Sequence, residues 1–236
     1  MNRRSRPRPA PSRLDAHVPT GAVLTGLTSD PGGPEPDPKP DAPERYRPAD
    51  LVRLCAEDVR TVMERDPSIK SLAEALLHPA LPALFVHRVA HLLHERGARL
   101  TARALMTCAR AITGTEIHPG ATLGRRVLID HGAAVVIGET AVVGDDVTIY
   151  HQVTLGAVGW WRDNRRLPGE RRHPVVGSGA VLGAGATVLG PVDIGDKAVI
   201  GAQALVMTDV PAGTHVVAAK ALRKSHDTLP SISWLP

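Results

Sequence analysis

The sequence is short of aromatic residues, and that shortage limits how its core can be built. Aromatic side chains make up 3% of the 236 residues, with a single Phe. A core without large rings must be filled by Val, Ile, Leu and Ala, which suits thin, regular layers better than a mixed globule. The composition is therefore the first indication of a repeat architecture.

Cysteine and long apolar runs are scarce as well. The two cysteines, Cys55 and Cys108, match neither a disulfide framework nor a metal-binding spacing. No run approaches the roughly 18 apolar residues of a membrane span. The opening "MNRRSRPRPAPSR" has no apolar stretch behind its arginines, so no secretion signal is predicted. Together these features favour a cytoplasmic protein without a membrane partner.

The net charge of +4 raises the question of a nucleic-acid partner. The arginines, however, cluster in the proline-rich start and in "WWRDNRRLPGERRHP", outside any recognised nucleic-acid motif. A solvated basic surface, or local attraction for an anionic small molecule, explains them better. No nucleic-acid partner is predicted.

Two segments of different character precede the glycine-rich part. Residues 1–48 contain 11 of the 21 prolines, and such a chain lacks the apolar surface to offset its ordering entropy, so disorder is predicted. Residues 49–112 space apolar side chains at three- and four-residue steps, which predicts a helical domain with Asp50 as N-cap. Breaks are expected near Pro79 and Pro82.

Histidines are frequent in the predicted helices, and a metal site is one explanation for them. His87, His91 and His94 fall roughly on one helix face. No carboxylate or cysteine completes a ligand set at matching spacing. Surface and interface histidines are therefore the favoured interpretation.

Beyond residue 111 the pattern changes to a six-residue repeat, and 17 of the 22 glycines lie there. Small aliphatic residues recur in steps of six, and glycine often follows them, which is the signature of a parallel β-helix whose coils contain three hexads each. Glycine is expected to turn the corners at positive φ. The aliphatic positions are Ile117, Leu123, Ile129, Ile137, Val143, Ile149, Leu155, Val176, Leu182, Val188, Ile194, Ile200 and Val206.

The repeat has two irregularities. Between Ile129 and Ile137 the step lengthens by two residues, in the stretch that contains Asp130 and His131. At residues 157–174 the period is lost, which predicts a loop expelled at one corner. Domains are thus expected at 49–112 and at 113–218, followed by a carboxyl-terminal tail, 219–236. The arrays suffice for about five coils.

Several motifs between the repeats occur in a specific order. "DPS" at 66–68, "HRVAH" at 87–91, the long run "TGTEIHPGATLGRRVLIDHGAAVVIGETAVVGDDVTIYHQVTLG" at 113–156, "RHP" at 172–174 and "VLGAGATVLG" at 181–190 together resemble the serine O-acetyltransferase family. The resemblance covers about residues 50–218. It implies an α+β fold, with a helical segment followed by a left-handed β-helix, although the usual crossover preference alone predicts a right-handed coil.

The resemblance also implies an activity and partners. It implies direct transfer of acetyl from acetyl-CoA to the hydroxyl of L-serine, ahead of cysteine synthesis, without a covalent acyl-enzyme, a metal or a permanently bound cofactor. A homotrimer is expected, with a dimer of trimers as the alternative. Pro236 stands where the family docks an isoleucine terminus into its sulfhydrylase partner, so no tight complex of that kind is expected.

Matching positions carry the family's catalytic roles over to this chain. By resemblance His131 is the general base and Glu116 the acid that holds its tautomer, as a serine hydroxyl requires at neutral pH. Asp66 and Asp130 would contact the acceptor's ammonium group. For Asp66, capping of the following helix is the alternative role.

Two further acceptor residues and the acetyl-CoA track follow from the same resemblance. Arg172 would bind the acceptor's carboxylate in a fork, and His173 is a further acceptor-site residue. Residues of the β-helix corners would line the thioester arm, although each also suits an ordinary corner. These are Gly156, Ala157, Ala184 and Ala202, with Lys220, Arg223 or Lys224 as candidates for the nucleotide phosphates.

Departures from the family pattern keep alternatives open. Ala157 replaces the second glycine of the usual "TLGG", and the arm before "RHP" is longer and carries Trp160 and Trp161. Transfer to another serine-like acceptor is therefore an alternative function. A zinc hydratase built on His118, His131 and His151 is disfavoured because the close histidine pair of that class is missing. A non-catalytic scaffold is disfavoured because the predicted base and acid are both present.

Overall fold

The computed structural model describes residues 47–159, 161, 165–167 and 169–219, all within one compact unit, Asp37–Pro236. The disorder predicted for residues 1–48 lies almost entirely outside the described residues. The expectations for five further residues also lie outside the described residues: Trp160, Lys220, Arg223, Lys224 and Pro236.

The described chain starts with a short helical layer. None of its helices is long and apolar enough to cross a membrane. The elements are a 3₁₀ turn, η1 (Pro48–Asp50), and four helices, α1 (Leu51–Arg65), α2 (Leu72–Leu76), α3 (Leu81–Glu95) and α4 (Arg99–Thr113).

One local expectation about these helices was wrong and another was confirmed. Asp50 occupies the N-cap position of α1, but its carboxylate accepts hydrogen bonds from the Arg47 backbone N–H (2.9 Å) and the Arg53 side chain (3.2 Å) instead of a helix N–H. The expected break near Pro79 and Pro82 is present, because α2 ends at Leu76 and α3 begins at Leu81. Pro82 lies in the first turn of α3, where an N–H has no partner within the helix.

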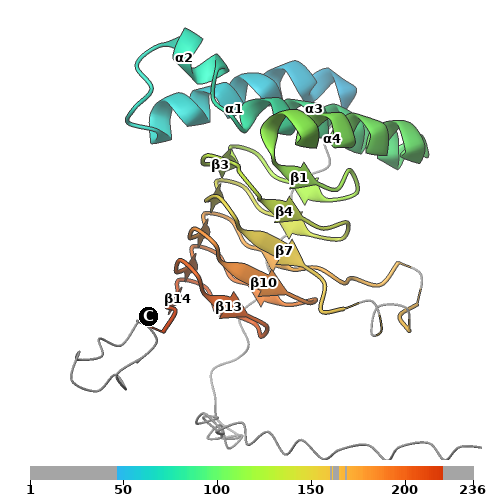
Figure 1. Cartoon of the computed structure of the whole chain (residues 1–236), viewed down its shortest axis with the longest axis vertical. Coiled ribbons are helices and arrows are strands. Elements are labelled where there is room, and N and C mark those ends of the chain that lie inside the picture. The colour runs from blue at the N-terminus through green and yellow to red at the C-terminus, as the bar shows by residue number, and fades with distance from the viewer. Residues whose placement is uncertain (1–46, 160, 162–164, 168, 220–236) are drawn as a thin grey trace, which may run out of the picture. The chain divides into compact units, whose positions relative to one another are not determined.

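The helical layer covers one end of the strand region (Figure 1). Two buried histidines of α3 attach the layer to the first coil. The His87 Nε2 atom lies 3.1 Å from the Ala121 carbonyl oxygen, and the His91 Nδ1 atom lies 2.9 Å from the Pro119 carbonyl oxygen. These contacts agree with the prediction of interface histidines.

The rest of the described chain is built from very short strands, each two or three residues long. They are β1 (Glu116–Ile117), β2 (Thr122–Leu123), β3 (Leu128–Ile129), β4 (Val136–Ile137), β5 (Val142–Val143), β6 (Thr148–Ile149), β7 (Thr154–Gly156), β8 (Val175–Val176), β9 (Val181–Leu182), β10 (Thr187–Leu189), β11 (Asp193–Ile194), β12 (Val199–Ile200), β13 (Leu205–Val206) and β14 (His215–Val216).

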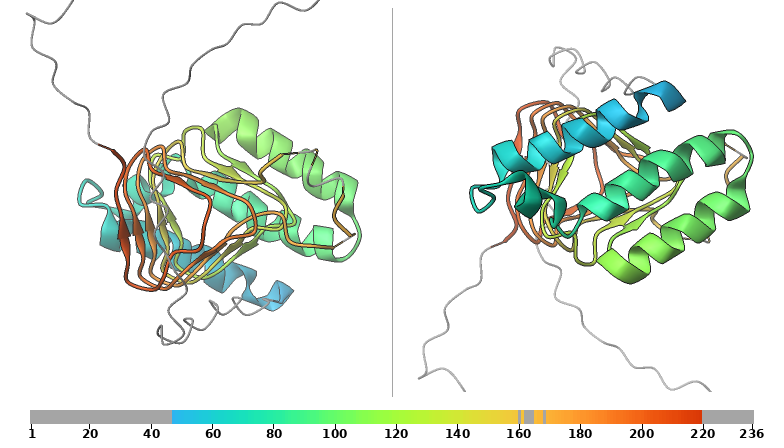
Figure 2. Two further views of the ribbon diagram at one scale, coloured as in Figure 1. Left: turned by 90° about the horizontal axis from the view of Figure 1, so that it is seen from below. Right: turned by 90° about the horizontal axis from the view of Figure 1, so that it is seen from above.

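The strands form three parallel sheets, and successive strands go to successive sheets. The orders are β1-β4-β7-β10-β13, β11-β8-β5-β2 and β14-β12-β9-β6-β3. Seen along the stack, the strands superimpose as a triangle (Figure 2). Each three strands thus complete one coil, so the predicted parallel-strand repeat of about five coils is confirmed.

Small aliphatic residues fill the interior, as the composition predicted. Every aliphatic position of the six-residue arrays is at most 4% exposed. A second buried row, two positions before each strand's inward residue, was not predicted. It consists mainly of Ala121, Val127, Val135, Ala141, Val147, Val153, Ala180, Ala186, Val192, Ala198 and Ala204.

The expected reason for the repeat glycines was wrong. None of the glycines that follow an inward aliphatic residue has positive φ. Their requirement is close stacking of coils: a Cβ on Gly124 would lie 2.6 Å from the Gly144 backbone, and one on Gly183 would lie 2.6 Å from the Ala202 nitrogen. Glycine is needed at these positions because the next coil's backbone fills the space of a side chain.

Candidate active site

The corner after β3 contains two residues more than the matching corner of the next coil. Asp130 and Tyr150 occupy equivalent positions, since each backbone N–H bonds to the following coil. In the next coil, the corner closes with a residue of positive φ two positions after Tyr150. In this coil the equivalent residue, Ala134, lies four positions after Asp130. His131 and Gly132 are therefore the additional residues, with φ of 61° and 72°.

This insertion presents the imidazole of His131 to solvent. The His131 side chain is 70% exposed, and its Nε2 atom lies 3.8 Å from the Asp130 carboxylate. The ring of His151, from the next coil, lies edge-on at a centroid distance of 5.6 Å. The expectation that Asp130 and His131 face outward agrees with this geometry.

Asp66 and His78 lie beside the same corner. One ligand atom each of Asp66, His78 and Asp130 lies within 4.8 Å of the others. Asp66 does not cap α2, because Ser71 fills that role through a hydrogen bond from Glu74 N. Asp66 instead accepts hydrogen bonds from Ser68 N (2.8 Å) and Ser68 Oγ (2.7 Å), which lower the pKa of its carboxyl.

Glu116 is not in contact with His131 in the described chain. Its carboxylate pairs with Arg110 at 2.9 Å, and no ion pair or hydrogen bond joins it to the histidine there. The two segments are nevertheless stacked, since Thr115 Oγ1 donates a hydrogen bond to the Gly132 carbonyl oxygen at 2.9 Å. The nearest carboxylate to His131 in this arrangement is Asp130.

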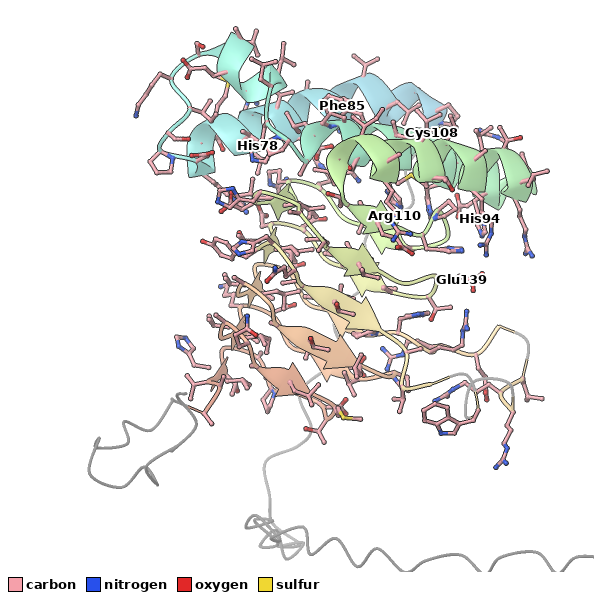
Figure 3. The ribbon with its side chains drawn as sticks, viewed as in Figure 1. His78, Phe85, His94, Cys108, Arg110 and Glu139 are labelled. Carbon is pink, nitrogen blue, oxygen red and sulfur yellow. The ribbon has the colours of Figure 1, made fainter. Side chains whose placement is uncertain are left out.

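Arg172 and His173 lie at a different corner, after β4. Thr140 Oγ1 accepts hydrogen bonds from the backbone N–H groups of Arg172 (2.8 Å) and His173 (3.1 Å), and the His173 Nδ1 atom lies 2.9 Å from the same oxygen. The guanidinium of Arg172 pairs with Glu139. In Figure 3, the labelled Glu139 and His94 lie at the opposite edge of the molecule from His78.

The corner after β4 borders a pocket of about 640 Å³. Arg172 lines this pocket and His131 does not. Burial raises the pKa of Glu139, but His118 and Arg172 outweigh burial and hold it below its usual value. The lining residues are His94, Arg99, Gly120, Thr122, Glu139, Thr140, Ala141, Val142, Arg166, Leu167, Gly169, Glu170 and Arg172.

The four positions predicted for acetyl-CoA are divided in the same way. Ala184 and Ala202 follow β9 and β12, in the corner column that also contains His131 and His151. Gly156 ends β7 and Ala157 follows it, in the corner column of Glu139. The residues predicted to bind the acceptor and those predicted to bind acetyl-CoA are thus each divided between two corners of one chain.

The sequence offered His78 only as one of several histidines that could suggest a metal site, and it gave no indication of Glu139 or Thr140. A local signal for His78 exists, since three side chains that precede proline accept a hydrogen bond from the N–H two residues later. The turns are Asp66-Pro67-Ser68, His78-Pro79-Ala80 and His118-Pro119-Gly120. Glu139 and Thr140 lie inside the long motif, but no local pattern links them to Arg172.

His118 shows what such a turn does to an imidazole. Its Nδ1 atom accepts from Gly120 N at 3.0 Å, so the neutral ring carries its proton on Nε2. Among the described residues Nε2 is buried without a hydrogen-bond partner. Desolvation lowers the pKa of His118 to about 4, so the ring is neutral at pH 7.

Comparisons with known proteins agree with the fold and the motifs. The family model described as "Bacterial transferase hexapeptide (six repeats)" matches residues 173–207. The described coils and this match define a hexapeptide-repeat transferase.

Curated relatives narrow the class. A serine acetyltransferase of Mycobacterium tuberculosis is 51% identical over 161 residues, 68% of this chain and 67% of that protein. One of Helicobacter pylori is 50% identical over 161 residues, 68% of this chain and 90% of that protein. The chain therefore belongs to the serine acetyltransferase family, whose members are acyltransferases.

Solved structures agree. Serine acetyltransferase isoform 3 of Entamoeba histolytica, in complex with cysteine, is 34% identical with a TM-score of 0.69, over 79% of this chain and 64% of that one. The Neisseria gonorrhoeae enzyme in complex with serine is 34% identical, with a TM-score of 0.66, over 74% and 69%. A serine acetyltransferase complex with CoA is 30% identical, with a TM-score of 0.66, over 72% and 68%.

Proposed function

We propose that this chain transfers the acetyl group of acetyl-CoA to the hydroxyl of L-serine, with His131 as general base. The observation that carries the proposal is the two-residue insertion after β3, which presents His131 next to the carboxylates of Asp66 and Asp130. A two-carboxylate cluster is suited to the ammonium group of an amino acid. The imidazole beside it is suited to the hydroxyl on the same small molecule.

The reaction follows from these positions. His131 accepts the proton of the serine hydroxyl as its oxygen attacks the thioester carbonyl carbon. The carbon–sulfur bond then breaks, and the departing thiolate takes up the proton from the imidazolium. O-acetyl-L-serine and CoA leave. No residue is acylated, so the serine hydroxyl is the only nucleophile and a positioned base provides about 10²–10⁴-fold acceleration.

Glu116 is proposed as the acid that orients His131 during turnover. Support comes from the hydrogen bond between Thr115 and Gly132, which keeps Glu116 and His131 on adjoining segments. Glu116 would have to exchange its exposed ion pair with Arg110 for the imidazole. Surface ion pairs contribute about 0–1 kcal/mol, so this exchange is energetically accessible.

The acceptor's carboxylate is proposed to bind Arg172, with His173 beside it. These residues belong to a different corner from His131, as do Gly156 and Ala157 from Ala184 and Ala202. A site assembled from one chain would leave each half incomplete. We therefore infer a homotrimer in which each site combines the His131 corner of one subunit with the Arg172 corner of its neighbour.

Acetyl-CoA is proposed as the co-substrate, with its thioester arm between the two corner columns. The small residues there leave the backbone accessible to the arm. A left-handed coil and a protruding loop at residues 157–174 belong to the same proposal. Their support is the family resemblance and the continuity of the coils on either side of the loop.

The test is the His131→Ala variant. We expect kcat to fall by about 10²–10⁴-fold, because the exposed side chain contributes little to the fold. Free thiol released from acetyl-CoA measures turnover, and size-exclusion chromatography verifies that the assembly is retained. Near-normal turnover in H131A would remove His131 from the mechanism. An acceptor panel in which another hydroxy amino acid clearly outpaces L-serine would overturn the proposed substrate.

A further inference from the structure

Asp66, His78 and Asp130 form a cluster beside the corner after β3. His78 is its one member to which the family resemblance assigns no role. It lies between α2 and α3, is 5% exposed, and faces Asp66 and Asp130 within 4.8 Å. Figure 3 labels His78 at the edge of the molecule where β3 meets the helical layer. A buried imidazole beside two carboxylates calls for a chemical explanation.

The turn at His78-Pro79-Ala80 determines which ring nitrogen of His78 carries the proton. His78 Nδ1 accepts a hydrogen bond from Ala80 N at 3.4 Å. The neutral ring therefore carries its proton on Nε2. A ring nitrogen of His78 lies within 4.8 Å of both carboxylates, and Nδ1 is already engaged by Ala80 N, so Nε2–H is the group available to donate to the acidic pair.

The same tautomer argues against a metal ion as the natural occupant of the cluster. A metal would need the lone pair of Nε2, and so a proton on Nδ1, where it would oppose the Ala80 N–H. Two carboxylates held side by side repel each other, however, and an adjacent N–H donor reduces that repulsion.

We propose that His78 is a positioning residue of the acceptor site: its Nε2–H holds the carboxylates of Asp66 and Asp130 in the arrangement that receives the acceptor's ammonium group. This inference rests on the proposed function and deepens it. Three groups face His78, namely Asp66 from the end of α1 and Asp130 and His131 from the corner after β3.

Protonation of His78 would link acceptor binding to pH. Burial lowers the pKa of His78, and the two carboxylates oppose that decrease. As the pH falls, the ring takes up a second proton and becomes a cation within the acidic pair. The imidazolium then competes with the ammonium group, so acceptor binding weakens toward low pH.

The test uses His78→Asn, because asparagine before proline keeps an acceptor for the Ala80 N–H and removes the ring. We expect the KM for L-serine to rise about tenfold, as for loss of a hydrogen bond to a charged group. The KM for acetyl-CoA should stay within about twofold, because the residues proposed to line the thioester arm do not include this cluster. His78→Phe, which keeps the ring volume, should behave like H78N.

The pH dependence is measured as the dissociation constant of L-serine in a His131→Ala background, which removes the proposed base and isolates binding from turnover. Binding in H131A should weaken as the pH falls from 7.5 to 5.5, and in H131A/H78N this dependence should disappear. An unchanged serine KM in H78N and H78F, or the same pH dependence in both backgrounds, would refute the role of His78. These results differ from failure of the proposed function, in which the wild-type chain would not acetylate L-serine at all.

Discussion

At the scale of single residues, Gly138 determines whether the Arg172 corner can form. A Cβ on this glycine would overlap the ring of His173. That ring cannot retreat freely, because Nδ1 accepts from Thr140 N at 3.1 Å and contacts Thr140 Oγ1. Gly138 has no positive φ, so its requirement is space and not conformation.

The Gly138→Ala variant should therefore displace His173. We expect a loss of about 1–3 kcal/mol in the free energy of unfolding from the overpacking, together with a raised KM for L-serine. Urea unfolding and acceptor kinetics measure the two effects. Gly97→Ala is the matched control: Gly97 has a φ of 84° but open space around it, so it should lose stability without a change in KM. Equal effects of both variants on KM would contradict the argument.

The sequence predicted the position of Asp130 and His131 better than that of the residues around them. The slip between Ile129 and Ile137 indicated that Asp130 and His131 leave the packed register, and the insertion of His131 and Gly132 explains why. His78 could not be placed in this way, because its approach to Asp130 depends on how α3 docks on the first coil. A six-residue period carries no information about that docking.

At the scale of elements, a buried ion pair joins the helical layer to the coils. Arg88 of α3 bonds to Asp58 of α1 through Nη2 (2.9 Å) and Nε (3.2 Å), and its Nη1 donates to the Leu123 carbonyl oxygen at 3.0 Å. Both side chains of the ion pair are fully buried. One guanidinium thus connects two helices and the end of β2.

The Arg88→Met variant should be destabilised by about 3–5 kcal/mol, because it leaves the Asp58 carboxylate buried without a partner. Burial raises the pKa of Asp58, and Arg88 opposes that rise. Without Arg88 the folded-state pKa lies further above the unfolded value, so the loss is largest at high pH and is relieved as the pH falls and Asp58 is protonated.

Urea unfolding of R88M and wild type at pH 8 and pH 5 measures this difference. The control is R88M combined with Asp58→Asn, which has no carboxyl to protonate and should lose the pH dependence. If R88M lost equal stability at both pH values, the buried carboxylate would not be the cause.

The strands of the repeat were predictable because the residues that specify each strand lie within one six-residue unit of the sequence. The inward residues repeat every six positions and close one coil after three hexads, so sequence alone locates them. The second buried row was less visible, since alanine and valine also occur outside the core. Helix packing was not predictable, because the pairing of Asp58 with Arg88 spans 30 residues and depends on how the two helices are arranged in space.

At the scale of the whole molecule, the division of the site between two corners predicts complementation. If His131 and Arg172 act in one site across a subunit boundary, His131→Ala and Arg172→Ala should each be strongly impaired alone. In randomly mixed trimers, about one quarter of the interfaces would pair the intact His131 of one variant with the intact Arg172 of the other. Coexpressed and copurified variants should therefore recover about that fraction of wild-type kcat. A mixture no more active than the separate variants would mean that both residues serve a site within one chain.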